Sequence, residues 1–145
     1  MTTTERSRMS SFEAIRPGGE EAAQQTRQQS EFEIEFFRRV LARHPQHLEV
    51  LRQQARLLAG RGLREEGLAC NRQLADELPH DPNVRYHLAC SLAALGLFDQ
   101  AVEALLQAVE LGYRDFDHLE SDPDLDALRD HPRFQAILRG HGLQS

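Results

Sequence analysis

The chain has 145 residues, a formal net charge of −6, and a composition of 40% hydrophobic and 28% charged residues. This mixture is typical of one globular domain with a modest core. The acidic balance argues against a general nucleic-acid binder, which needs a basic surface to neutralise phosphates. No apolar run is long enough to cross a membrane, and the first residues lack the apolar centre of a secretory signal, so we expect a cytoplasmic protein with no membrane partner.

All 17 basic residues are arginine. Without lysine, the chain has no residue for a Schiff base or for a lysine phosphate-binding loop. Glycine-rich nucleotide motifs and the nucleophile motif Gly-x-Ser-x-Gly do not occur either. Cys70 and Cys90 are the only cysteines, and without an export signal they are expected to be buried free thiols. These features predict a protein that is not an enzyme and uses no cofactor.

Residues 1–30 are rich in Thr, Ser, Gln, Glu and Arg, with Pro17, Gly18 and Gly19 in the middle. Such a segment buries too little apolar surface to offset the entropy cost of ordering, so we expect a disordered or transiently helical tail. Phe12 and Ile15 are its candidate docking residues.

Apolar residues at helical spacing begin at Glu31, and this first helix is expected to end before Pro45. Further helices are predicted over about 48–59 and 65–78, separated by a turn at Gly60, Arg61 and Gly62. Asp81 and Pro82 have the residue types of a helix N-cap and first turn. Residues 82–111 then read as two amphipathic helices joined at Gly96.

A shift of the sequence by 34 residues superimposes the two helical pairs. Small, turn and large apolar positions coincide, and Pro45 falls on Pro79. This period with a helix-turn-helix unit resembles the tetratricopeptide repeat family. The positions that carry the resemblance, together with Gly67 where the family usually has alanine, are Ala55, Gly62, Leu88, Ala89, Gly96, Ala101 and Ala108.

The resemblance implies an all-α, right-handed solenoid of helical hairpins with about two and a half repeats over residues 31–114. An array of this kind exposes apolar surface at its last helix unless a polar-faced segment covers it. Residues 115–145 fit that role, because Ser121 or Asp122 can cap a turn opened by Pro123, and Asp130 or His131 can cap a second turn opened by Pro132. This segment resembles the closing segment of some bacterial tetratricopeptide arrays.

Three groups of residues have side chains of the types that catalytic or metal sites use. The acidic run at Asp122 lacks the glycine and the final acid of a calcium loop. His44 and His47 flank a helix end and do not have the spacing of metal ligands. His87 lies one helical turn from Cys90, but no third catalytic partner is evident. We therefore predict no catalytic residue and no metal site.

The family places its binding surface on the inner helix of each hairpin. The resemblance therefore predicts a protein-interaction adaptor that binds its partner on the concave face. Arg52 and Arg56, one helical turn apart, predict that the bound segment is acidic or carboxylate-bearing. The alternatives are a small chaperone for an exported or assembling client and a self-associating structural subunit, so a homo-oligomer is possible. The residues expected on the concave face are Glu49, Arg52, Arg56, Asn83, Tyr86 and Cys90.

Overall fold

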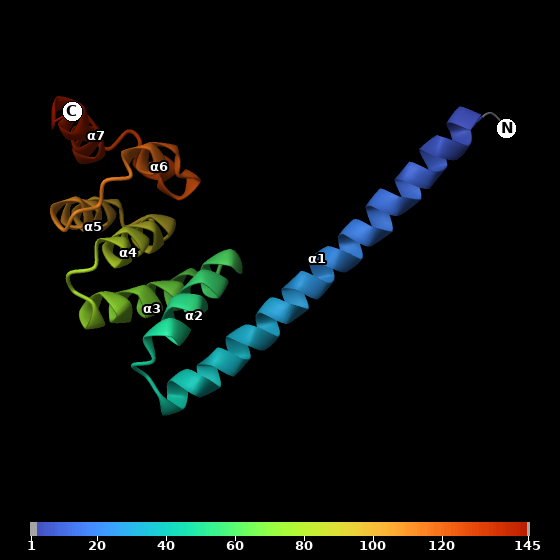
Figure 1. Cartoon of the computed structure of the whole chain (residues 1–145), viewed down its shortest axis with the longest axis horizontal. Coiled ribbons are helices and arrows are strands. Elements are labelled where there is room, and N and C mark those ends of the chain that lie inside the picture. The colour runs from blue at the N-terminus through green and yellow to red at the C-terminus, as the bar shows by residue number, and fades with distance from the viewer. Residues whose placement is uncertain (1–2, 145) are drawn as a thin grey trace.

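A computed structural model describes the backbone of residues 3–144 and the side chains of residues 19–140. All regular structure in residues 3–144 is helical, which confirms the predicted all-α class (Figure 1). None of the helices in this part of the chain has the length and hydropathy needed to cross a membrane. The elements are α1 (Thr3–Arg43), α2 (Leu48–Gly60), α3 (Arg64–Glu77), α4 (Pro82–Ala94), α5 (Phe98–Glu110), α6 (Phe116–Ser121), the 3-10 helix η1 (Pro123–Leu128) and α7 (Pro132–Gln144).

Helices α2 and α3 form one hairpin, and α4 and α5 form the next. Each hairpin turns at a glycine with positive φ, 73° at Gly62 and 77° at Gly96, a conformation that disfavours residues with a side chain. The two turns have the same pattern of backbone hydrogen bonds. In the second, the Gly96 amide donates to Ala93 O (3.0 Å) and the Leu97 amide donates to Leu92 O (3.0 Å).

The N-terminus of each hairpin is capped by a side chain, and the cap of α4 is the one that the sequence predicts. The Asp81 carboxylate accepts the amides of Asn83 (2.9 Å) and Val84 (3.3 Å), and Pro82 occupies the first turn of α4. His47 caps α2 by accepting the Val50 amide. These caps satisfy backbone donors that the helices leave free.

Helix α1 ends at Arg43 as predicted, but it begins at Thr3. Residues 3–30, for which the sequence predicts a disordered or transiently helical tail, belong to this continuous helix. The side chains of residues 19–29 are exposed, and local bonds such as Thr26 Oγ1 to Ala22 O (2.9 Å) support the helix there. The side chains of Phe12 and Ile15 lie outside the described residues.

The core runs through the hairpins into the C-terminal segment. Small side chains allow close helix approach, and Ala89, Ala101 and Ala108 are fully buried. Gly67 is also buried, and a Cβ there would lie 3.7 Å from Leu58 Cβ, which is ordinary contact distance. Ala55 and Leu88 are buried too, so the predicted packing positions lie in the core, while Gly62 and Gly96 occupy the turns.

Helices α6, η1 and α7 cover the C-terminal end of the hairpin stack. Asp122 caps η1 by accepting the Asp124 amide (2.9 Å), and His131 caps α7 by accepting the Arg133 amide (3.2 Å). The covering side chains have no exposed area. They are Leu119, Leu125, Leu128 and Phe134.

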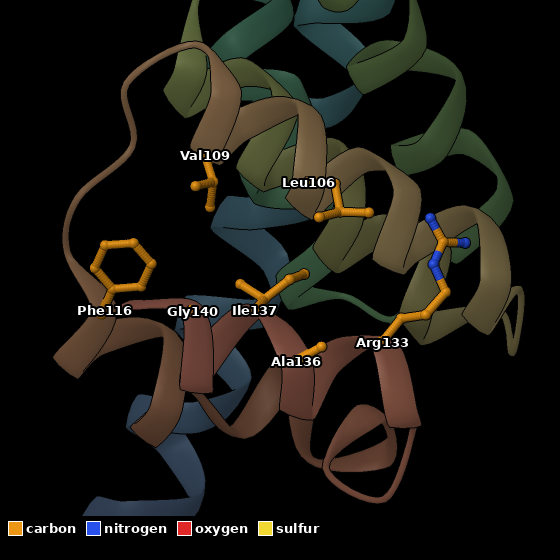
Figure 2. Close-up of a pocket in the computed structure, with 7 residues that line it drawn as sticks. All are labelled: Leu106, Val109, Phe116, Arg133, Ala136, Ile137 and Gly140. Atoms are coloured by element: carbon orange, nitrogen blue, oxygen red, sulfur yellow. The ribbon is translucent and has the colours of Figure 1, made fainter. Parts of the chain in front are cut away.

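The cover is incomplete between α5 and α7. Val102 and Leu105 of α5 are fully buried, but Leu106 and Val109 line an open groove of about 300 Å³ (Figure 2). Figure 2 shows both side chains pointing toward Ile137 of α7. The groove is mainly apolar and has Arg133 among its lining residues, where the guanidinium pairs with Glu103 of α5 at 2.6 Å.

Candidate functional site

The predicted concave face lies on α2 and α4. Arg52 and Arg56 are one helical turn apart on α2, where Arg52 is half-buried and Arg56 is exposed. Arg52 Nη2 lies 3.5 Å from Asp81 Oδ2, a distance at the weak end for an ion pair. Arg56 makes no ion pair with any side chain among residues 19–140. One arginine of this pair therefore has no partner to neutralise its charge.

His87 of α4 belongs to the same surface, although the sequence did not place it there. The pKa of its imidazole is lowered from 6.5 by desolvation and by the positive charges of Arg52 and Arg56. The negative charges of Asp122 and Asp81 raise the pKa and offset part of this shift. This electrostatic coupling places the three side chains near one another. We call Arg52, Arg56 and His87 the basic patch.

Glu49 and Asn83 are exposed at the N-terminal ends of α2 and α4. Glu49 accepts a hydrogen bond from Gln53 Nε2 at 3.1 Å. Both residues therefore remain accessible, as predicted for a concave-face position.

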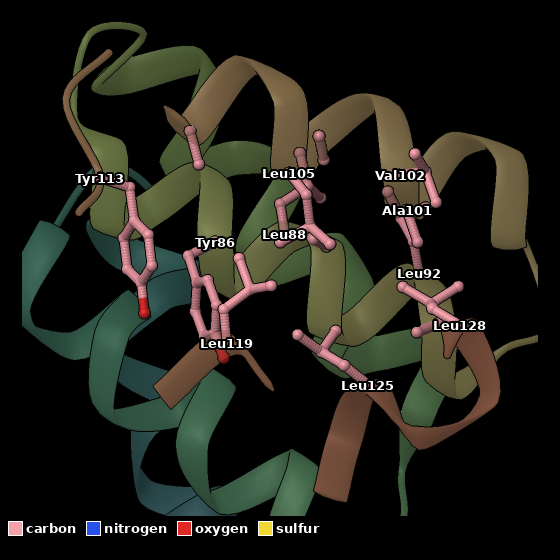
Figure 3. Packing of buried hydrophobic residues seen from close by; sticks show 14 of the residues in the cluster. Tyr86, Leu88, Leu92, Ala101, Val102, Leu105, Tyr113, Leu119, Leu125 and Leu128 are labelled. Atoms are coloured by element: carbon pink, nitrogen blue, oxygen red, sulfur yellow. The ribbon is translucent and has the colours of Figure 1, made fainter. Parts of the chain in front are cut away.

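Tyr86 contradicts the expectation of an exposed contact residue, because it is only 3% exposed. Its ring stacks on Tyr113 with centroids 4.7 Å apart and planes at 7° (Figure 3). The C-terminal segment supplies this cover, with the His118 ring 5.5 Å from the Tyr86 centroid. The sequence interpretation did not anticipate that the segment after α5 returns across α4.

Asp122 joins the C-terminal segment to Tyr86. Its Oδ1 accepts the Asp124 amide, while Oδ2 accepts the Tyr86 hydroxyl and lies 3.4 Å from His118 Nε2. Burial, the hydrogen bond to Asp122 and nearby charges raise the pKa of the Tyr86 hydroxyl far above its usual value, so this hydroxyl remains a donor. A buried carboxylate needs such donors.

Cys90 is half-buried and lies beside this junction rather than on an open surface. Its Sγ is 4.0 Å from Asp122 Oδ2, and with Asp124 these residues place three possible metal-ligand atoms within 4.8 Å of one another. However, burial and the two carboxylates raise the pKa of the Cys90 thiol well above its usual value, which opposes the thiolate that a metal requires. Asp122 is already used as a cap and an acceptor.

Cys70 is also a free, half-buried thiol, and burial and Glu66 raise its pKa. Both thiols are therefore held in the protonated form at neutral pH, in which a cysteine is a poor nucleophile. The arrangement can bind an anionic group at the basic patch, and it offers no activated nucleophile there.

No protein-family model matches the chain. Among curated proteins, a chloroplastic protein of Arabidopsis thaliana is 37% identical over 54 residues. The matched segment is 37% of this chain and 16% of the Arabidopsis protein. The chain thus covers only a small part of that relative's length.

Proposed function

We propose that the chain is a short tetratricopeptide-like array that acts as a protein-interaction adaptor. Its ligand is an acidic or carboxylate-bearing segment of a partner protein, bound at the basic patch on α2 and α4. The observation that carries this proposal is an exposed Arg56 beside Arg52 and His87 that has no ion-pair partner among the described side chains of residues 19–140.

The repeat geometry supports the array. The turns at Gly62 and Gly96 lie 34 residues apart and have the same backbone hydrogen bonds. A third glycine, Gly112, again donates to the carbonyl three residues before it, at 3.1 Å. Successive helices from α1 to α5 contact one another in chain order, which is how helical repeats stack.

Local charge supports an acidic ligand although the whole protein is acidic. Charges separated by more than about 8 Å are largely screened at cellular ionic strength, so the patch acts on its immediate surroundings. A guanidinium presents several donors to a carboxylate, and such charge-assisted bonds are stronger than neutral ones. Tyr86 packs beside this patch, since its ring lies edge-on to the His87 ring with centroids 5.9 Å apart.

The test compares capture of partner proteins by wild-type chain and by the double variant Arg52→Glu with Arg56→Glu. We expect the double variant to lose partners that the wild-type chain captures, while its helical circular dichroism and melting stay unchanged. The matched control is Arg64→Glu with Arg139→Glu, two exposed arginines that form no ion pair with residues 19–140. Normal capture by the patch variant, confirmed by titration with the identified partner, contradicts the proposal.

A further inference from the structure

Two large aromatic side chains on α1 are exposed. Phe32 is 70% exposed and Phe36 is 53% exposed, the highest values among the exposed large apolar side chains of residues 19–140. They lie four residues apart and therefore form one continuous patch on a helix. Exposed apolar patches of this kind mark interaction sites.

This patch points away from the rest of the molecule. Ile34 is buried, and Phe37 and Leu41 are half-buried, on the side of α1 that contacts α2. At 3.6 residues per turn, Phe32 and Phe36 lie on the opposite side of the helix. A partner can therefore approach the patch without meeting α2.

The internal repeat shows that this aromatic patch is specific to the first helix. Shifted by 34 and 68 residues, Phe32 corresponds to Glu66 and Gln100, which are both polar and exposed. Phe36 corresponds to Cys70 and to Ala104, which is 4% exposed within the stack. Helix α1 therefore has aromatic residues where a free end of an array needs a polar face.

We propose that α1 is the interface of a two-fold symmetric dimer, in which the patch packs against the same patch of a second copy of this chain. An antiparallel pairing places Phe32 of each copy against Phe36 of the other. Such an interface is self-complementary and closed, because the same residues are used on both sides. The proposal does not depend on a ligand at the basic patch.

Charge complementarity supports the antiparallel direction. Arg39 and Arg43 lie on the same side of α1 as the aromatic patch, and neither forms an ion pair within residues 19–140. The proposed pairing brings Arg39 of one copy opposite Gln29 of the other. Gln29 Nε2 donates to Glu33 Oε1 at 3.0 Å, so a carboxylate lies next to this position. A parallel pairing instead brings Arg39 against Arg39.

A dimer of this kind buries the helix surface around the aromatic patch as well as the rings. Fully buried aromatic residues contribute about 150–250 Å² each, and Phe32 and Phe36 are 70% and 53% exposed, so four rings supply roughly 370–620 Å². Stable interfaces bury about 1,200–2,000 Å² in total. Residues 25–43 extend the contact over about 28 Å of helix on each copy, which supplies the remainder.

The first test measures the mass of the full chain against concentration by sedimentation or light scattering. We expect a dimer that dissociates on dilution, and at least about tenfold weaker association for Phe32→Gln with Phe36→Ala, which introduces the residues found at 100 and 104. The control Phe98→Gln removes another partly exposed phenylalanine, 38% exposed on α5, and leaves the mass unchanged. A monomeric wild-type chain at about 100 μM, or an unchanged dimer in the double variant, overturns the proposal.

The second test examines the direction of the pairing. Arg39→Glu weakens the dimer because it places a carboxylate opposite Gln29 of the second copy, one helical turn from Glu33. Adding Glu33→Arg to the same chain reverses both charges and restores association in the antiparallel arrangement. Failure of this second change to restore the dimer, with circular dichroism unchanged, contradicts the antiparallel register.

Discussion

Asp122 is the residue on which the interactions between α4 and the C-terminal segment converge. Its carboxylate is only 7% exposed and accepts from the Asp124 amide and from the Tyr86 hydroxyl. A hydrogen bond to a charged group contributes more to stability than one between neutral groups. The Tyr86 hydroxyl therefore has a structural role although the residue is next to His87 in the basic patch.

Replacing Tyr86 with phenylalanine keeps the ring stack on Tyr113 and removes one donor from Asp122. We expect the free energy of unfolding to fall by about 1.5–3 kcal/mol, the range for hydrogen bonds to charged groups. Urea denaturation measures this change. In a double-mutant cycle with Asp122→Asn, the two effects are expected to be strongly non-additive. Additive effects show that the two side chains do not interact in solution.

His87 gives the molecule a pH response whose sign follows from its environment. Its pKa in the folded protein is below 6.5, so the unfolded chain binds more protons between 6.5 and the lowered value. The free energy of unfolding therefore falls as pH falls through this window. We expect a smaller fall in His87→Gln between about pH 7.5 and 5.5, measured by urea denaturation. Identical pH profiles of the two proteins contradict the assigned environment.

At the scale of elements, the C-terminal segment is the one on which the stack depends. Removal of Asp122–Ser145 takes away Leu125, Leu128 and Phe134, whose burial contributes about 1.5–3 kcal/mol each. That loss approaches the total stability of an ordinary domain. We therefore expect association or partial unfolding, seen by gel filtration and by a lower melting temperature.

The control truncation removes residues 1–24 from the opposite end. The described side chains within it, residues 19–24, are exposed, so the melting temperature is expected to stay unchanged. An equally stable monomer after the C-terminal deletion, matching this control, shows that α6, η1 and α7 do not hold the stack together.

The helices from α2 to α5 could be predicted closely because proline, glycine and apolar spacing are local signals. Asp81 with Pro82 indicates where α4 begins, and Gly96 indicates where the hairpin turns. The start of α1 could not be predicted in this way, since its exposed residues form a helix without apolar periodicity. Composition indicated correctly that residues 19–29 bury little surface, but not their backbone conformation.

The candidate site was only partly predictable. Arg52 and Arg56 could be placed together from their spacing on one helix. The burial of Tyr86 depends on Tyr113, His118 and Asp122, which are distant in sequence and meet it only after the chain folds back. Periodicity within one helix carries no information about such a contact.

At the scale of the whole molecule, the helices form a series in which most contacts join neighbours in the chain. The exceptions are at the C-terminal end, where η1 contacts both α4 and α5. Stability in such an arrangement is close to a sum over units and their interfaces. The two ends are unequal, since α1 carries the exposed Phe32 and Phe36 while the other end is covered.

The cover follows α5 in the chain, and this order affects folding during synthesis. The ribosome adds about 5–20 residues per second, and Phe134 follows the end of α5 by 24 residues. Helix α5 is therefore complete for roughly 1–5 s before Phe134 of α7, a helix that contacts it, has been synthesised. Over this interval the nascent chain presents an apolar surface that the finished protein hides, and during it a chaperone or a neighbouring nascent chain has access to α5.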